Sequence, residues 1–126
     1  MLRKKLLLVD DSATILLMER YIFRNDPYEI VTATDGDEAI EMAVHHRPDL
    51  ILLDVTMPRM GGLEACRLLR AKDETRAIPV IMVMNRDEKA EVQKGWNHGC
   101  TDFVMKPINA VELLAKVRGL LATASV

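Results

Sequence analysis

The sequence predicts an α/β domain in which a doubly wound parallel sheet carries helices on both faces. Short apolar runs alternate five times with longer segments that have helical periodicity. The apolar runs are continuous rather than alternating, which is typical of parallel strands buried on both faces. The chain has 126 residues and is 49% hydrophobic, so we expect one domain over residues 1–126 with a single packed core.

The first strand–helix unit begins with the apolar run Leu6–Val9, which we expect to form a buried strand. Ser12 is a suitable cap for a helix over about Ala13–Arg24, where apolar residues recur with helical spacing. Pro27 then lies in the turn that leads to the second strand.

The second unit pairs a strand over Glu29–Ala33 with a helix over about Asp37–His46. The acidic run Asp35–Glu38 opens this helix, where negative charge suits the positive end of the helix dipole. Pro48 follows the helix and prevents its continuation.

The third strand, Leu50–Asp54, is the most hydrophobic run, so we place it at the centre of the sheet. A loop with two glycines, Met57–Gly62, connects this strand to a helix over about Leu63–Lys72.

The last two units complete the alternation of strands and helices. Strands are predicted over Pro79–Met84 and Asp102–Met105, separated by a shorter, more polar helix over Asp87–Asn97. Asn109 is a suitable cap for the final helix, about Ala110–Leu121.

Three of the predicted strands end at charged side chains. Asp10 and Asp11 follow the first strand, and Asp54 ends the third. Lys106 follows the fifth strand. Ligands bind at the carboxyl ends of the strands in such folds, and three acids with one lysine suit Mg²⁺ and a phosphoryl group. Taken singly, each acid is equally consistent with a helix cap or a strand end.

Bulk composition excludes several functional classes. The net charge of −2 indicates neither a nucleic-acid surface nor a polybasic membrane patch. Cys66 and Cys100 are too few for a disulfide framework, so we expect both to be reduced, in a cytoplasmic protein. The basic start Arg3–Lys5 precedes only four apolar residues, too few for a signal peptide, and no run approaches the roughly 18 residues of a membrane span.

Together these motifs resemble the receiver domain of two-component response regulators. The segments that carry the resemblance occur in order along most of the chain: Val9–Ser12, Leu53–Gly62, Ile78–Met82 and Asp102–Pro107. The resemblance implies a flavodoxin-like (βα)5 fold with strand order 2-1-3-4-5. It also implies a chemotaxis-type single-domain receiver that is phosphorylated rather than an enzyme, although such a domain can catalyse its own phosphorylation and dephosphorylation.

The resemblance assigns roles to five residues. Asp54 would be the phosphoacceptor, and Lys106 would contact the phosphoryl oxygens. Mg²⁺ (or Mn²⁺) would bind Asp11 directly and Asp10 mainly through water. Asp54 and the backbone carbonyl of Thr56 would complete the protein ligands.

One position departs from the family pattern. Typical receivers carry Thr or Ser where this chain has Met84, which has no hydrogen-bond donor. A missing bond to a charged acceptor is worth roughly 1.5–3 kcal/mol. We therefore expect a weakened or rewired switch, in which the amide of Asn85 is a candidate substitute donor and Phe103 is the aromatic switch residue. Met84 is equally consistent with a simple apolar filler.

Other residues have roles implied only by relatives. Thr56 and Arg86 occupy the two positions that tune how fast water removes the phosphate, although Arg86 is also consistent with a solvated surface charge. The peptide between Lys106 and Pro107 would be cis. Trp96 is unusual in a polar helix, and it suits either a partner contact or partial burial.

The expected partners are a histidine kinase or phosphotransfer protein and a downstream protein. The downstream protein would bind the face formed by 87–97, 102–105 and 110–121. We expect a monomer or weak dimer, either stand-alone or a segment of a longer regulator, with no direct binding to nucleic acid or membrane. The alternative is a pseudo-receiver that works only through protein contacts, which Met84 favours.

Two enzyme or cofactor classes fit less well. A phosphatase of the haloacid dehalogenase type needs a second Asp two residues after its nucleophile, and here that position holds Thr56. A flavin or dinucleotide binder needs a phosphate loop, such as G-x-G-x-x-G, which is absent, and Asp10 and Asp11 would repel phosphate without a metal.

Overall fold

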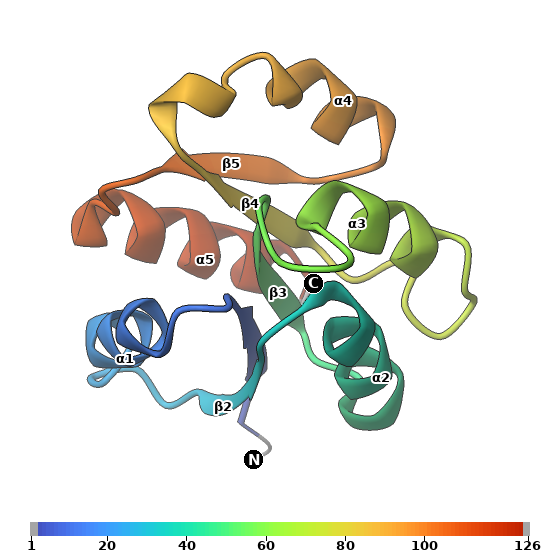
Figure 1. The fold of residues 1–126 in the computed structure, drawn as a ribbon. Coiled ribbons are helices and arrows are strands. Elements are labelled where there is room, and N and C mark those ends of the chain that lie inside the picture. Colours follow the sequence, from blue (N-terminus) through green and yellow to red (C-terminus); the bar gives the residue numbers. More distant parts are fainter. Residues whose placement is uncertain (1–2, 125–126) are drawn as a thin grey trace.

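The computed structural model describes residues 3–124, which form one parallel sheet flanked by helices (Figure 1). The strands are β1 (Lys5–Val9), β2 (Glu29–Ala33), β3 (Leu50–Asp54), β4 (Val80–Met84) and β5 (Asp102–Met105). They pair in the order β2-β1-β3-β4-β5, all parallel. The doubly wound fold and its strand order are therefore confirmed.

Helices cover both faces of the sheet (Figure 1). They are α1 (Ala13–Ile22), α2 (Gly36–His46), α3 (Gly62–Arg70), α4 (Glu91–Asn97) and α5 (Ala110–Ala124), with a 3₁₀ turn η1 (Arg86–Glu88) before α4. Buried residues of α1 and α5 pack on one face, and those of α2 and α3 pack on the other.

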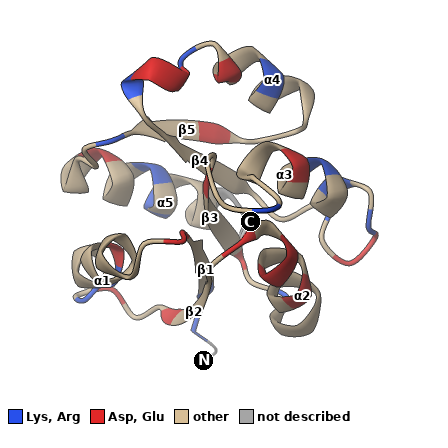
Figure 2. Ribbon diagram, in the orientation of Figure 1, with Lys and Arg blue, Asp and Glu red and all other residues tan. Residues whose placement is uncertain are grey.

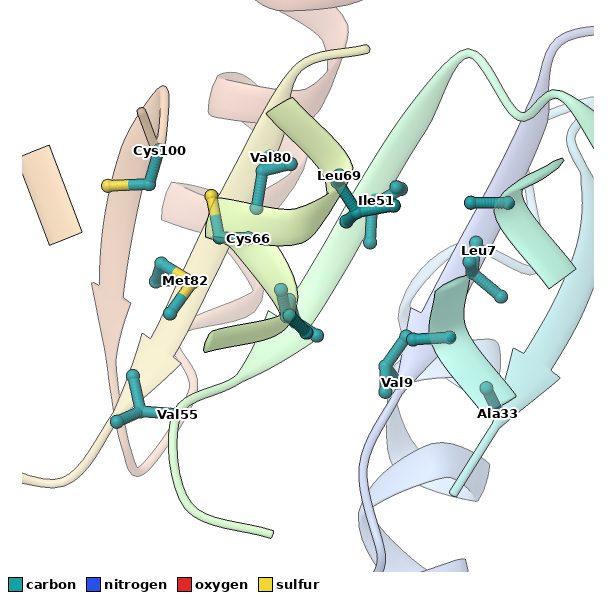
Figure 3. Packing of buried hydrophobic residues seen from close by; sticks show 14 of the residues in the cluster. Leu7, Val9, Ala33, Ile51, Val55, Cys66, Leu69, Val80, Met82 and Cys100 are labelled. Atoms are coloured by element: carbon teal, nitrogen blue, oxygen red, sulfur yellow. The ribbon is translucent and has the colours of Figure 1, made fainter. Parts of the chain in front are cut away.

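The period of two along each strand divides the core into two clusters. Leu7 and Ile51 point toward α2 and α3, in the cluster that Figure 3 shows. Their neighbours Leu6 and Leu50 point toward α1 and α5. Aliphatic side chains and methionines fill both clusters, so the sheet is buried on both faces and its polar residues collect at the strand ends.

Local capping follows the predicted signals. Side-chain oxygens of Ser12, Asp35 and Asn109 each accept a hydrogen bond from a first-turn N–H of the helix that follows, at 3.3, 2.8 and 2.9 Å. Each cap satisfies an N–H that has no partner inside the helix. The acidic run before α2 is therefore a helix start, as expected.

Several predicted boundaries moved by one to three residues, among them the ends of α1, at Ile22 rather than Arg24, and of α3, at Arg70 rather than Lys72. β4 begins at Val80 rather than Pro79, since proline has no N–H to donate to the sheet. The last helix continues past the expected Leu121 to Ala124.

The predicted helix over 87–97 was wrong as a single element. Asn85 and Glu88 form a reciprocal capping box, in which each side chain accepts the other residue's backbone N–H. This local bonding closes η1 as a separate turn, and α4 begins only at Glu91.

Both cysteines are buried and unbonded to each other, as expected. Within residues 3–124, every helix falls short of the length and apolarity that a bilayer-spanning segment needs.

Candidate functional site

The carboxyl ends of β1 and β3 bring three acidic side chains together. Parallel pairing sets Val9 beside Leu53, so the residues that follow leave the sheet at the same edge. Carboxylate oxygens of Asp10, Asp11 and Asp54 lie within 4.8 Å of one another. Asp10 and Asp54 are buried and Asp11 is exposed, so the cluster is open to solvent at Asp11. Figure 2 shows the acidic segments after β1 and at the end of β3.

Lys106 brings one positive charge to this cluster from the end of β5. Its Nζ lies 3.4 Å from Oδ1 of Asp54 and 3.6 Å from Oδ2 of Asp10. Its backbone N–H donates to the Met84 carbonyl at 2.7 Å, which extends the β4–β5 pairing and fixes the start of the side chain. The Lys106–Pro107 peptide is cis, as expected.

The pocket carries more negative charge than one lysine balances. The pKa of Asp54 is raised to about 6, first by burial and then by the Asp10 carboxylate, although Lys106 opposes both effects. Burial also raises the pKa of Asp10. Burial lowers the pKa of Lys106, but Asp54 and Asp10 more than compensate and leave it above its usual value. A second cation near these acids would relieve their mutual repulsion.

One carboxylate oxygen of Asp10 lacks a hydrogen-bond partner among the described residues. Its Oδ1 accepts the Ser12 N–H at 2.9 Å. Its Oδ2 is buried and has no hydrogen-bond partner among the described residues, and the Lys106 ammonium lies 3.6 Å away. Buried carboxylate oxygens without a donor are costly, and a hard divalent cation or its bound water satisfies them.

The loop between β3 and α3 folds back tightly over the end of β3. A Cβ at Gly62 would lie 2.2 Å from the Asp54 carbonyl oxygen, so only glycine allows this approach. The Gly62 N–H donates to the Val55 carbonyl at 2.8 Å. Arg59 adopts a positive φ of 63° and pairs with Asp35. Thr56 is thereby held at the rim, exposed beside Asp54.

The position where typical receivers carry a hydroxyl is buried in the hydrophobic core of this domain. Met84 is fully buried and belongs to the core cluster between the sheet, α2 and α3. Phe103 packs against the same cluster and meets the Trp96 ring edge to face, with ring centroids 4.9 Å apart. Trp96 is 48% exposed, so it is partly buried against Phe103 and still faces solvent, and a partner contact at this residue stays a prediction.

The loop after β4 contacts the loop after β3 through Glu88. The Glu88 Oε1 accepts the Asn85 N–H at 2.6 Å, and its Oε2 accepts the Thr56 hydroxyl. Asn85 and Arg86 are exposed, and the Asn85 side chain caps η1. Their roles in switching and dephosphorylation remain predictions.

One acidic residue near the site was missed in the sequence. Glu19 of α1 is 1% exposed, and its Oε1 has no hydrogen-bond partner within the described chain. Burial raises its pKa to about 8, with a further contribution from Asp10. Its position three residues after Leu16 and four before Phe23, both buried, places it on the core face of the helix. A charge on an apolar helical stripe was the available signal.

Residues 6–118 match the model of the response regulator receiver domain. The chain belongs to this family. It is therefore a receiver domain of two-component signalling, as the motifs at the strand ends predicted.

Curated relatives are longer proteins with the same domain. The alkaline phosphatase synthesis transcriptional regulatory protein PhoP of Bacillus subtilis is 35% identical over 120 residues, which cover 95% of this chain and 49% of PhoP. The response regulator PleD of Caulobacter vibrioides is 42% identical over 117 residues, covering 92% of this chain and 26% of PleD. The receiver thus spans half or less of the length of these relatives.

Solved structures agree with the fold. Chemotaxis protein CheY4 of Vibrio cholerae superposes with a TM-score of 0.87 at 33% identity, covering 94% of this chain and 99% of CheY4. The receiver domain of sensor histidine kinase PA1611 from Pseudomonas aeruginosa superposes with a TM-score of 0.87 at 25% identity, covering 96% and 99%. That structure has a magnesium ion coordinated in its active-site cleft.

Proposed function

We propose that this receiver accepts a phosphoryl group on Asp54 and passes the signal to a partner protein. The observation that carries the proposal is the position of Asp54, which lies 3.4 Å from the Lys106 ammonium inside a cluster of three carboxylates. A nucleophilic carboxylate beside a fixed cation suits attack on phosphorus, since the cation balances charge on the transferring group.

The donor is proposed to be a phosphohistidine of a histidine kinase or phosphotransfer protein. An Asp54 oxygen attacks phosphorus, the bond from phosphorus to the histidine nitrogen breaks, and an aspartyl phosphate forms. Lys106 then pairs with the phosphoryl oxygens in place of the free carboxylate. The exposed side of the cluster at Asp11 leaves room for the donor's approach.

The residues present fit Mg²⁺ (or Mn²⁺) as the cofactor. Asp10, Asp11 and Asp54 supply oxygen ligands from one small volume, and the buried Oδ2 of Asp10 has no hydrogen-bond partner among the described residues. The Thr56 carbonyl is the proposed backbone ligand. When bound, the ion would neutralise the carboxylates and the incoming phosphoryl charge.

Output is proposed to pass through the face formed by α4, β5 and α5. Trp96 is an exposed aromatic side chain on this face, and such residues often anchor partners. The domain acts as a cytoplasmic phosphoprotein in this proposal, as a monomer or weak dimer, and catalyses at most its own phosphorylation and dephosphorylation.

A second candidate is a pseudo-receiver that signals only by binding partners. Met84 favours it, because the buried thioether offers no donor to a phosphoryl group. The intact acid cluster and Lys106 favour phosphorylation instead.

Phosphorylation by a small donor separates the two candidates. The protein is incubated with acetyl phosphate and Mg²⁺, and its intact mass is measured. We expect one phosphoryl group on wild type and none on Asp54→Asn, whose amide has the same shape but is a poor nucleophile. Unmodified wild-type protein under these conditions would favour the pseudo-receiver.

A further inference from the structure

Glu88 joins the two loops that border the candidate phosphorylation site. One carboxylate oxygen accepts the Thr56 hydroxyl, and the other accepts the Asn85 N–H at 2.6 Å. Thr56 lies two residues after Asp54, and Asn85 is the first residue after β4. The carboxylate therefore connects the rim of the phosphorylation site to the segment that leads into α4.

The surroundings of Glu88 are already rich in negative charge. The cavity of about 440 Å³ between these loops is lined by Thr56, Glu88 and three further carboxylates, those of Glu64, Asp87 and Glu91. Glu91 pairs with Lys94, and Glu64 pairs with Arg67. Glu88 is bound instead to a hydroxyl and an amide, neither of which neutralises its charge.

The usual route between a phosphoryl group and this loop is missing at Met84. That side chain is fully buried in the core and has no donor to offer. A different connection is needed if phosphorylation is to move α4, and the Glu88 contact is a direct side-chain bridge from the loop after Asp54.

We propose that Glu88 is a positioning residue whose contact with Thr56 is a latch that opens on phosphorylation. This inference rests on the proposed function. In the resting domain, the latch holds η1 and the start of α4 against the loop after β3. A phosphoryl group on Asp54 replaces the single charge of the carboxylate with about −1.5 to −2 charges two residues from Thr56. This added negative charge repels the Glu88 carboxylate and drives it away from the hydroxyl.

Opening the latch releases both contacts of Glu88, the one with the Thr56 hydroxyl and the one with the Asn85 N–H. Glu88 also caps the Asn85 N–H, so its displacement removes one of the two bonds of the capping box that defines η1. The segment from Asn85 to Val92 is then free to take a new position. In this way the charge on Asp54 reaches the α4 face without a hydroxyl at residue 84.

The test is an amide NMR titration with Mg²⁺ and beryllofluoride, a mimic of the phosphoryl group, on wild type, Glu88→Gln, Glu88→Ala and Asp87→Asn. Gln keeps the length of Glu and can still accept the Asn85 N–H on its oxygen, while its NH2 donates to the Thr56 hydroxyl oxygen, but it lacks the charge on which repulsion acts. Asp87→Asn removes a charge from the adjacent residue of the same cavity and is the matched control. The pocket amides of residues 10, 54 and 106 report binding of the mimic in every variant.

The latch predicts a distinct pattern for each protein. In wild type and Asp87→Asn, beryllofluoride shifts both the pocket amides and those of residues 85–92. In Glu88→Gln the pocket shifts persist, while the shifts at 85–92 fall to less than half. In Glu88→Ala the amides at 85–92 are displaced before the mimic is added, and the mimic moves them little further.

Two results would overturn the latch. If Glu88→Gln responds at 85–92 as fully as wild type, Glu88 is only a cap, because a cap needs no charge. If wild type shows pocket shifts but none at 85–92, the latch does not open and phosphorylation remains supported. An absence of pocket shifts in wild type would instead remove the proposed function itself, and the latch with it.

Discussion

The Nζ of Lys106 lies 3.4 Å from Oδ1 of Asp54, at the carboxyl ends of strands that are not neighbours in the sheet. The same ammonium lies 3.6 Å from Asp10, so one cation is shared by two buried carboxylates. Burial and the Asp10 carboxylate raise the pKa of Asp54 to about 6, because the shared ammonium offsets only part of these two effects. This arrangement supports the proposal that the site takes a divalent ion beside the carboxylates and an anionic group beside Lys106.

Removing the Lys106 charge should raise the pKa of Asp54 further. In Lys106→Met, burial and the Asp10 carboxylate act without an opposing cation, so the pKa should move above about 6. Carboxyl carbon NMR titration of Asp54 measures this directly. Phosphorylation by acetyl phosphate should also slow by about a hundredfold, since a fixed charge at the transferring group is lost. Lys116→Met is the control, because Lys116 pairs with Asp102 and Glu112 instead; an equal effect in that variant would contradict the assignment.

Binding of Mg²⁺ should weaken in acid. A carboxylate must be deprotonated to ligate a metal, and the pKa of Asp54 is about 6. The affinity measured by calorimetry should therefore fall as the pH drops below about 6 and level off above it. Asp11→Asn should lower the affinity at least about tenfold at neutral pH, whereas Asp37→Asn, on the exposed start of α2, should not change it. Equal affinities at pH 5 and 8 would be incompatible with a site at Asp54.

Glu19 should make the domain less stable as the pH rises. Its pKa is about 8 in the folded domain and 4.5 without burial. Between these values the unfolded chain has lost the Glu19 proton and the folded chain retains it. The free energy of unfolding should therefore decrease as the pH rises from about 4.5 to 8. Below about pH 4.5 Glu19 is protonated in both states, so it adds nothing to the pH dependence of the stability there.

Replacing Glu19 isolates this contribution. Glu19→Leu should be more stable than wild type at pH 8, by about 1–3 kcal/mol for a buried unpaired polar group. The advantage should shrink toward pH 5. Urea unfolding at both pH values gives the comparison, and Glu41→Leu, on an exposed position of α2, controls for a general gain in hydrophobicity. Parallel pH profiles for wild type and Glu19→Leu would disprove this role of Glu19.

Trp96 and Phe103 should stabilise each other. Their rings meet edge to face with centroids 4.9 Å apart, a geometry worth about 0.5–1.5 kcal/mol beyond simple burial. A double-mutant cycle with Trp96→Leu and Phe103→Leu, measured by urea unfolding, should return a coupling energy in that range. Strictly additive losses would show that the two rings are independent.

Much of the fold and site followed from the sequence because both depend on local signals. Continuous apolar runs marked the strands, and charged residues directly after them marked the ligand-binding edge. The sequence predicted that Asp10, Asp54 and Lys106 lie close together, because the carboxyl ends of parallel strands meet at the same edge of a sheet. The short distances between the carboxylates, and the position of one ammonium between two of them, became visible only in the three-dimensional structure.

The missed features depend on contacts between distant segments. The Glu88 carboxylate meets the Thr56 hydroxyl across 32 residues, and no periodicity predicts such a pair. The short N-x-x-E pattern of Asn85 and Glu88 is typical of a helix cap but was not recognised in the sequence, and this cap explains why α4 begins later than the predicted helix over 87–97. Glu19 interrupts the apolar stripe of α1, which the count of apolar residues alone does not reveal.

The most direct measurement is an amide NMR titration of the wild-type receiver with Mg²⁺ followed by beryllofluoride. If Asp54 is the phosphoacceptor, Mg²⁺ shifts the amides around residues 10, 11 and 54–56, and beryllofluoride adds large shifts that reach 106 and 85–97. The Asp54→Asn variant should lose the beryllofluoride response. A wild-type spectrum that does not respond to beryllofluoride in the presence of Mg²⁺ would contradict a phosphorylated receiver and leave partner contact as the domain's only input.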